Sequence, residues 1–218
     1  MDLRVEKTKE NIQNHFWDLL RTTSFHEISV RQLVQECRIN RSTFYRNYED
    51  KYDLLNQIVQ ELLTQFSEAL RPAVESLCVP HTCAAQSCFN PLLDFFCANS
   101  SVLQILRARE LPVDLFGDMQ REFSALLLRQ FETHYSLNEQ EQGVASCFSR
   151  MISANILAVV LWWHTEYPQI SRDKVLRIMS ATVEKGIVPS LQQELMNRAF
   201  FVPSALKAIN RSRSEERR

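Results

Sequence analysis

Glycine is scarce in this sequence. It has three glycines among 218 residues, at positions Gly117, Gly143 and Gly186. Tight turns, sheet bends and phosphate-binding loops all draw on glycine, so this scarcity favours helices joined by short polar links. The three positions also exclude the glycine motifs of dinucleotide-binding folds, P-loop proteins and α/β-hydrolases, because none of those spacings is present.

Long apolar runs are also missing. The longest uncharged apolar stretch, Met151–Trp163, has 13 residues. A membrane span needs about 20, so we expect a buried helix here and no membrane association. The first nine residues alternate charged and apolar side chains, and we expect no signal peptide from them. Six cysteines without such a signal favour reduced thiols in a cytoplasmic protein.

The overall charge gives no preference for nucleic acid. The formal net charge is −1, so a local group of basic residues must carry any such function. The hydrophobic fraction of 45% is ordinary for a globular protein. Neither an internal repeat nor an alternating strand pattern is present. The sequence therefore predicts an all-α fold.

The first fifty residues predict three helices. One over residues 6–22 presents its apolar side chains on one face. Ser29 is predicted to cap a short second helix, with Gln32 completing a capping box. Asn40 is predicted to cap a third helix over residues 41–48. A short amphipathic helix followed by two short ones is the plan of a helix-turn-helix.

Longer helices are predicted beyond these three. Asp50 is expected to cap a helix that ends near Leu70, before Pro72 and a boundary over 79–87. Five further helices are then expected over residues 90–99, 102–109, 113–135, 140–166 and 171–198. The predicted domains are a DNA-binding domain over 1–50, an effector-binding and dimerisation domain over 51–203, and a frayed tail over 204–218. The last twelve residues of this tail have a net charge of +3.

The predicted third helix has two chemically different faces. Phe44 and Tyr48 form an inner, apolar face. The outer face offers cations and hydrogen-bonding groups, as a helix in the major groove of DNA requires: Arg41, Ser42, Thr43, Tyr45, Arg46 and Asn47. From Ser29 to Lys51 there are five basic and three acidic residues, which is a modest positive balance.

This segment resembles the tetracycline-repressor (TetR/AcrR) family. The resemblance covers about fifty residues, with Thr43-Phe44-Tyr45 and the later Asp50-Lys51 followed by Leu54-Leu55 at the spacing of the family. Two residues depart from the family pattern, because Ser24 and Arg38 stand where glycine is usual. A side chain in a left-handed turn costs about 1 kcal/mol, so Arg38 is expected to re-aim the turn slightly. The stretch Leu161–Trp163 followed by Pro168 resembles, more weakly, regulators of dihydroxyacetone kinase operons.

The resemblance implies a role for each matching residue. Ser29 would donate to a phosphate, Tyr45 and Arg46 would hold the DNA backbone, and Lys51 would clamp a flanking phosphate. Three residues would lie nearest the base edges: Arg41, Ser42 and Thr43. Arg41 is the best candidate for pairing with a guanine, although contact with a phosphate is about equally expected. The full predicted DNA-binding set is Ser29, Arg41, Ser42, Thr43, Tyr45, Arg46, Asn47 and Lys51.

The resemblance also implies a homodimer on a palindromic operator. The helices over 140–166 and 171–198 would form a four-helix bundle with their copies. A cavity in the second domain would bind a small-molecule effector. Its candidate lining is Phe95, Phe96, Phe116, Met119, Phe123, Met151, Asn155, Trp162 and His164. Composition alone favours the alternative that these residues are ordinary core.

The expected function is a transcriptional repressor released by its effector. An activator or coactivator of the dihydroxyacetone kinase type is the first alternative, and a helical interaction protein with a degenerate head is the second. No spacing joins Cys or Ser with His and a carboxylate, so no enzyme is expected. Four residues of types that ligate metals lie within one segment, with Cys97 beyond: Cys78, His81, Cys83 and Cys88. Because no C-x-x-C pair is present, we predict no metal site and no cofactor.

Overall fold

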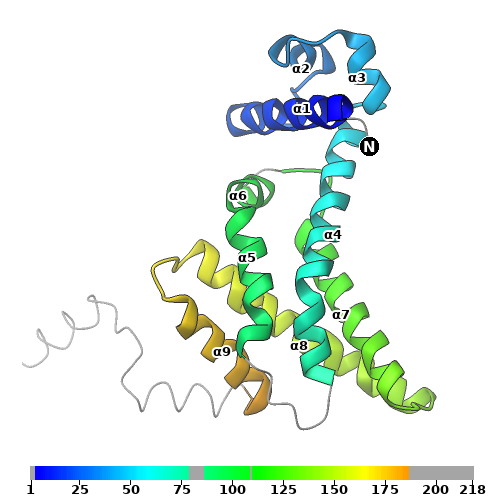
Figure 1. Ribbon diagram of the computed structural model, residues 1–218, viewed down its shortest axis with the longest axis vertical. Coiled ribbons are helices and arrows are strands. Elements are labelled where there is room, and N and C mark those ends of the chain that lie inside the picture. The colour runs from blue at the N-terminus through cyan, green and yellow to red at the C-terminus, as the bar shows by residue number, and fades with distance from the viewer. Residues whose placement is uncertain (1–2, 79–85, 109, 187–218) are drawn as a thin grey trace, which may run out of the picture.

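A computed structural model of the chain describes residues 3–78, 86–108 and 110–186. Within these ranges it is all-helical and contains no strand, which confirms the predicted fold class. Figure 1 shows a small head at one end of a larger bundle. The head consists of α1 (Leu3–Thr22), α2 (Val30–Glu36) and α3 (Arg41–Asn47). The first helix begins three residues earlier than its periodicity predicts.

Local caps delimit the helices of the head. The Ser29 Oγ accepts a hydrogen bond from the Gln32 backbone N–H at 3.2 Å, which caps α2 as predicted. The reciprocal bond from the Gln32 side chain is absent from the described contacts, so half of the expected capping box forms. Asn40 has the extended backbone of an N-cap at α3, but its side chain makes no capping bond. The helix α3 therefore begins after an extended residue whose side chain does not cap it.

The head joins the bundle through α4 (Lys51–Cys78). The Asp50 Oδ1 accepts hydrogen bonds from the backbone N–H groups of Tyr52 and Asp53, both at 2.8 Å, and so caps this helix as predicted. The predicted end near Leu70 is wrong, because the helix continues through Pro72. Ala73 and Val74 are buried beyond the proline, and this packing offsets the backbone hydrogen bond that proline removes.

The bundle has five more α-helices within the described ranges, preceded by a short 3-10 helix, η1 (Gln86–Phe89), that the sequence analysis did not predict. They are α5 (Asn90–Ala98), α6 (Ser100–Ala108), α7 (Leu115–His134), α8 (Glu139–Thr165) and α9 (Arg172–Glu184). Their bounds follow the predicted ranges closely as far as α9. The predicted unbroken helix over 171–198 is wrong, because α9 ends at Glu184, with Lys185 as its C-cap and Gly186 in the left-handed region at a φ of 84°. Pro189 and the predicted tail over 204–218 lie outside the described residues.

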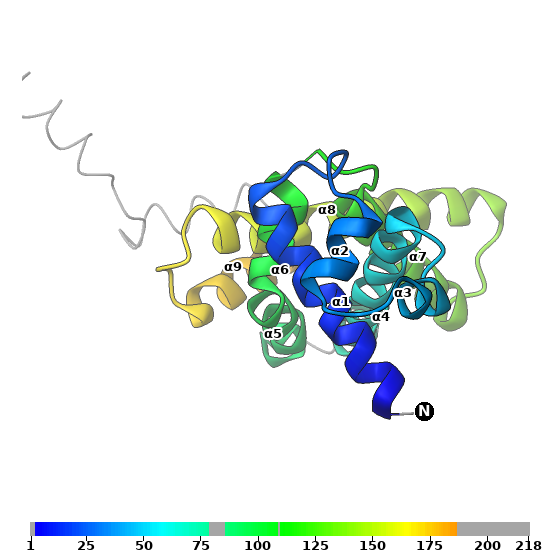
Figure 2. The same cartoon turned by 90° about the horizontal axis from the view of Figure 1, so that it is seen from above.

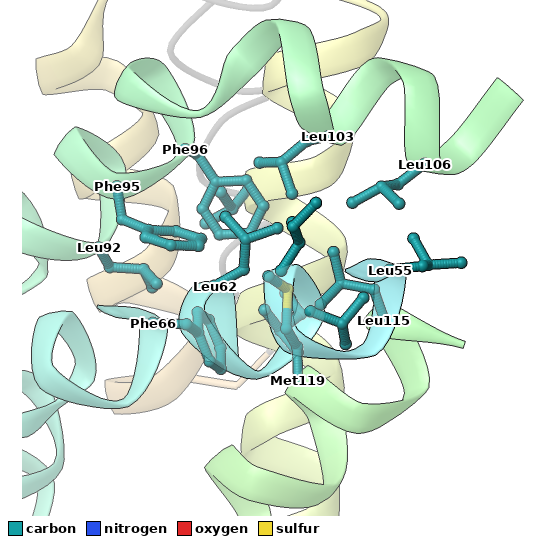
Figure 3. Close-up of a cluster of buried hydrophobic side chains, with 14 of the residues drawn as sticks. Leu55, Leu62, Phe66, Leu92, Phe95, Phe96, Leu103, Leu106, Leu115 and Met119 are labelled. Atoms are coloured by element: carbon teal, nitrogen blue, oxygen red, sulfur yellow. The ribbon is translucent and has the colours of Figure 1, made fainter. Parts of the chain in front are cut away.

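One continuous apolar core runs through head and bundle. Figure 3 shows its central part, where leucine and phenylalanine side chains from α4, α5, α6 and α7 meet. The Phe66 ring of α4 lies 5.6 Å from that of Phe95 and 6.4 Å from that of Phe96, measured between centroids. The head lies over α4 and α6 when viewed from above (Figure 2), and α1 contacts α6 directly. Because α6 contacts α1, a shift of α6 would be passed directly to the head.

The helix α8 is only partly buried, which corrects the expectation of a buried helix. Its inner face packs into the bundle, and its outer face exposes Val144, Phe148 and Met151 at 54%, 55% and 60% of their surface. By length and composition it is the one helix in the described ranges that is able to span a membrane, with a mean hydropathy of 1.7 over its most apolar window. Of that window, 28% is buried inside the structure.

Candidate nucleic-acid interface and ligand pocket

The outer face of α3 is open to solvent. Phe44 and Tyr48 are buried beneath it, while Arg41, Ser42 and Arg46 are exposed and Tyr45 is exposed over 49% of its surface. Two predicted residues are half-buried, Thr43 and Asn47. The predicted division between an apolar inner face and a polar outer face is confirmed. The helix is thus held from below and presents hydrogen-bonding groups outward.

Some side chains on this face are already engaged. The Asn47 Nδ2 donates to the Thr43 carbonyl oxygen at 2.8 Å, so this amide is turned back along α3. The Arg41 guanidinium lies over the Tyr45 ring, 5.9 Å from its centroid, and the stacking limits the directions in which Arg41 reaches out. Ser42 and Arg46 have no hydrogen bond or ion pair with any described residue. These two side chains are the least constrained groups of the face.

Lys51 is held inside the head. Its Nζ donates to the backbone carbonyl oxygens of Phe25, His26 and Ile28 at 2.8, 2.9 and 2.8 Å. An ammonium group has three N–H donors, so all three are used within the chain. The same Nζ lies 4.9 Å from the centroid of the Phe25 ring. Lys51 therefore fastens the loop between α1 and α2, and in this conformation it does not extend toward a flanking phosphate.

Ser29 and Arg38 shape the two loops of the motif. The exposed Ser29 hydroxyl accepts the capping bond of α2, and its own hydrogen stays available to a phosphate oxygen. Arg38 has a φ of 52°, which is the left-handed conformation expected where the family usually has glycine. The turn between α2 and α3 thus holds a non-glycine residue in the left-handed region.

The carboxylates near the interface accept hydrogen bonds from backbone N–H groups at and just before the start of α4. The Asp50 side chain accepts from the first turn of α4, and the Asp53 Oδ2 accepts from the Glu49 backbone N–H at 2.9 Å. Their negative charge lies at the N-terminus of α4, where the helix dipole favours it. The acids that follow α3 therefore lie past its C-terminal end, away from the exposed arginine at its first position, Arg41.

A separate pocket of about 390 Å³ opens between α5, α6, α7 and α8. It is lined by Phe96, Leu103, Gln104, Arg107, Ala108, Phe116, Leu161, His164 and Thr165. Three residues predicted from the sequence are among them: Phe96, Phe116 and His164. Burial lowers the pKa of His164 below its usual value of 6.5, and hydrogen bonding to the Phe96 backbone opposes the shift.

The other predicted pocket residues lie elsewhere. Met119 and Phe123 are fully buried in the core, and Phe95 packs against Phe66. The Asn155 Oδ1 accepts from the Thr182 hydroxyl at 2.8 Å, between α8 and α9. Two residues lie outside the pocket on α8: Trp162, stacked on Tyr167 at 5.1 Å, and the exposed Met151. The sequence analysis missed the pocket residues of α6 and also Leu161 and Thr165 of α8, because apolar periodicity does not show that these two helices face one pocket.

No metal centre is formed by the described residues, which contain no group of three His, Cys, Asp or Glu side chains suited to one. The side chain of Cys78 and residues His81 and Cys83 lie outside the described part. Burial raises the pKa of Cys37 to about 11 and also raises that of Cys88. Because the thiolate is the reactive form, these two thiols are poor nucleophiles at neutral pH. Cys97 and Cys147 are exposed.

The sequence is similar to two bacterial regulators. It is 18% identical over 179 residues to an uncharacterized HTH-type transcriptional regulator, YxbF, of Bacillus subtilis, an alignment that covers 80% of this chain and 45% of that protein. It is 34% identical over 53 residues to the HTH-type dhaKLM operon transcriptional activator DhaS of Lactococcus lactis, covering 24% of this chain and 28% of the activator. The chain thus spans less than half the length of either relative.

Among solved structures, a dihydroxyacetone kinase operon activator, DhaS, aligns with 85% of this chain and 95% of its own, at 20% identity and a TM-score of 0.47. No family model matches the sequence. The two sequence alignments establish similarity to transcriptional regulators of the helix-turn-helix type.

Proposed function

We propose that the protein is a sequence-specific transcriptional regulator of the tetracycline-repressor type, cytoplasmic, and controlled by a small molecule. One observation carries the proposal: α3 exposes Arg41, Ser42, Tyr45 and Arg46 above a fully buried Phe44. A rigid helix with hydrogen-bonding groups on its outer face is what docking into a major groove requires. Similarity to regulators named for this motif supports the same conclusion.

Dimerisation is part of the proposal. The exposed stripe of Val144, Phe148 and Met151 on α8 supports a second copy as its cover, because contiguous apolar surface on a soluble protein marks an interaction site. A twofold dimer would place two copies of α3 about 34–36 Å apart, one DNA turn, to match a palindromic operator. The contact of α6 with α1 supports coupling between the pocket and the head.

We propose that the protein represses transcription and is released from DNA when its ligand binds. Activation is the second candidate, because the 53-residue match at 34% identity is to a protein named as an operon activator. Transcription in vitro from the bound promoter, with and without the protein, separates the two. A rise in transcript would favour activation, and a fall would favour repression.

The DNA-binding proposal is tested by fluorescence anisotropy on a duplex from upstream of its own gene and on a scrambled duplex, across a salt series. Wild type is expected to prefer the first duplex, with affinity that falls steeply as salt increases. Tyr45→Ala should weaken binding at least tenfold. Tyr135→Ala, which changes an exposed tyrosine at the end of α7, is the matched control. Equal and weak binding to both duplexes, unchanged by Tyr45→Ala, would contradict the proposal.

A further inference from the structure

The pocket between α5, α6, α7 and α8 combines an apolar wall with a single charge. Its apolar lining comes from Phe96, Leu103, Phe116 and Leu161. Among the described residues that line the pocket, Arg107 is the only arginine or lysine and none is a carboxylate. A cation beside an apolar surface, with no acid in the lining, selects for ligands that carry a negative charge.

Some arginines of the bundle are ion-paired in the described structure and others, including Arg107, Arg150 and Arg177, are not. Arg121, Arg129 and Arg172 form ion pairs with Asp118, Glu122 and Asp94. Arg107 has no ion pair with any described residue, and it lies in the last turn of α6. The helix dipole favours a cation at that position, and Arg107 is exposed, so its guanidinium donors are accessible to a ligand. These donors match the geometry of a carboxylate, which accepts two parallel hydrogen bonds from one guanidinium.

The remaining polar groups of the pocket limit how much charge it accepts. The Thr165 hydroxyl donates to the Leu161 carbonyl oxygen at 2.8 Å, so its donor is already used. His164 is half-buried with its ring edge-on to Phe96, at 6.2 Å between centroids. Gln104 is exposed and neutral. Arg107 is therefore the one cation that the described lining offers, and it matches a ligand with one negative charge.

Another hollow, of about 470 Å³ between α7 and α8, also contains arginines, but it fits a ligand less well. It is lined in part by Arg121 and Arg150 and by small side chains. Arg121 already pairs with Asp118 and lies near Asp114, so its charge is largely neutralised. The aromatic wall that would hold an organic body is confined to the first pocket, where Phe96 and Phe116 meet.

We propose that this pocket binds a small organic carboxylic acid, with the carboxylate paired to Arg107 and an apolar body packed against Phe96, Leu103, Phe116 and Leu161. The inference rests on the proposed function in one respect, that this acid is the ligand controlling DNA binding. Four lining residues belong to α6, the helix that contacts α1. A ligand in the pocket would therefore contact the helix on which the head rests, and could shift the position of the head.

Binding is measured on the full-length protein by isothermal titration calorimetry, without DNA. The probes are benzoate, 3-phenylpropionate and octanoate, each compared with its neutral amide of the same shape. At least one acid is expected to bind about tenfold or more tightly than its amide, the size of effect typical of a charged hydrogen bond. Equal affinity of acid and amide in every pair, or no binding of any acid at millimolar concentration, would overturn the proposal.

Variants assign the preference to the pocket. Arg107→Gln should remove the preference for the acid, and Arg107→Lys should retain part of it because the charge is kept without the two-pronged geometry. Ala108→Trp, at an exposed lining position, should fill the mouth and weaken acid and amide alike. Arg129→Gln, on α7 outside the pocket, is the control and should change neither. An undiminished preference in Arg107→Gln would overturn the assignment.

Adding the best acid to the protein–DNA complex separates the two proposals. If acids bind through Arg107 but the protein shows no preference for its upstream DNA, the pocket stands and the DNA-binding function fails. If DNA binding is specific and no acid binds, the DNA-binding function stands and the assignment of the pocket fails. Release of DNA by the acid, lost in Arg107→Gln, would support both.

Discussion

At the N-terminus of α4, the three hydrogens of one ammonium group meet three carbonyl oxygens of the chain. Lys51 donates to Phe25, His26 and Ile28, in a loop whose direction sets the start of α2 at Ser29. The family resemblance implies instead that Lys51 clamps a phosphate. These two roles differ in an observable way, because a phosphate contact releases counterions and an internal hydrogen bond does not.

Replacing Lys51 with Met tests the internal role. We expect a loss of stability of about 1–3 kcal/mol, because buried or half-buried carbonyl oxygens lose their donors. DNA affinity should fall at every salt concentration with the slope of log K against log salt unchanged. The comparison is Arg46→Gln, which should reduce that slope by about one phosphate contact. A slope that falls equally in Lys51→Met would show that Lys51 moves out to bind DNA.

Arg38 carries strain in the turn between α2 and α3. Its φ of 52° is the left-handed conformation that L side chains rarely adopt. Arg38→Gly should stabilise the protein by up to about 1 kcal/mol, since relief of strain outweighs the greater freedom of glycine in the unfolded chain. Urea denaturation measures the change. A loss of stability in this variant would mean that the arginine side chain makes a compensating contact.

At the scale of the helices, one arginine ties α9 to α5. The Arg172 Nε donates to the Asn90 Oδ1 at 2.9 Å, and its Nη2 donates to the Asn90 carbonyl oxygen at 2.7 Å. A third bond reaches the Asp94 Oδ1 at 2.6 Å and holds the pKa of that carboxyl below its usual 3.8. The N-termini of two helices distant in the sequence are thereby held together.

Arg172→Gln should release this tie. We expect a melting temperature lower by a few degrees, and an Asp94 pKa that returns toward 3.8 when followed by NMR. Because the folded pKa of Asp94 is lowered, its pairing contributes stability above the unfolded pKa, and that stability is lost as pH falls through the folded value. The melting temperatures of variant and wild type should therefore converge in acid. Arg177→Gln, at an exposed position on the same helix, is the control.

At the scale of the whole molecule, the outer face of α8 is the surface through which we propose that two copies assemble. Val144, Phe148 and Met151 are exposed along one stripe, and the exposed thiol of Cys147 lies among them. The opposite face of the same helix packs into the bundle through Ile156, Leu157 and Val160. The helix is therefore apolar on both sides, as expected of one that contacts its own core and a second copy.

A charge on this stripe should break the dimer. Wild type is expected to sediment as a dimer, and Phe148→Glu as a folded monomer that binds palindromic DNA weakly. Val5→Glu, which alters an exposed apolar residue of α1, should leave the dimer intact. Short thiol-reactive cross-linkers should join two copies through Cys147. A monomeric wild type that partitions into lipid vesicles would contradict the dimer and favour the membrane alternative that the composition of α8 permits.

Local chemistry made much of this protein predictable. The caps at Ser29 and Asp50, the left-handed turn at Arg38 and the two faces of α3 depend on residues a few positions apart, so the sequence alone determines them. The scarcity of glycine and the apolar periodicity likewise determined that the fold is all-helical. The DNA-binding surface that we propose is therefore largely a property of one short segment.

Tertiary structure decided the features that depend on distant partners. Packing of Ala73 and Val74 carries α4 through Pro72, and three carbonyls of a preceding loop hold Lys51 inside the head. The exposure of Met151 and the place of Arg107 beside Phe116 follow from how α6, α7 and α8 cross. Apolar periodicity shows which face of a helix is buried, but not which helix it meets, and that choice is made by the packing of the whole chain.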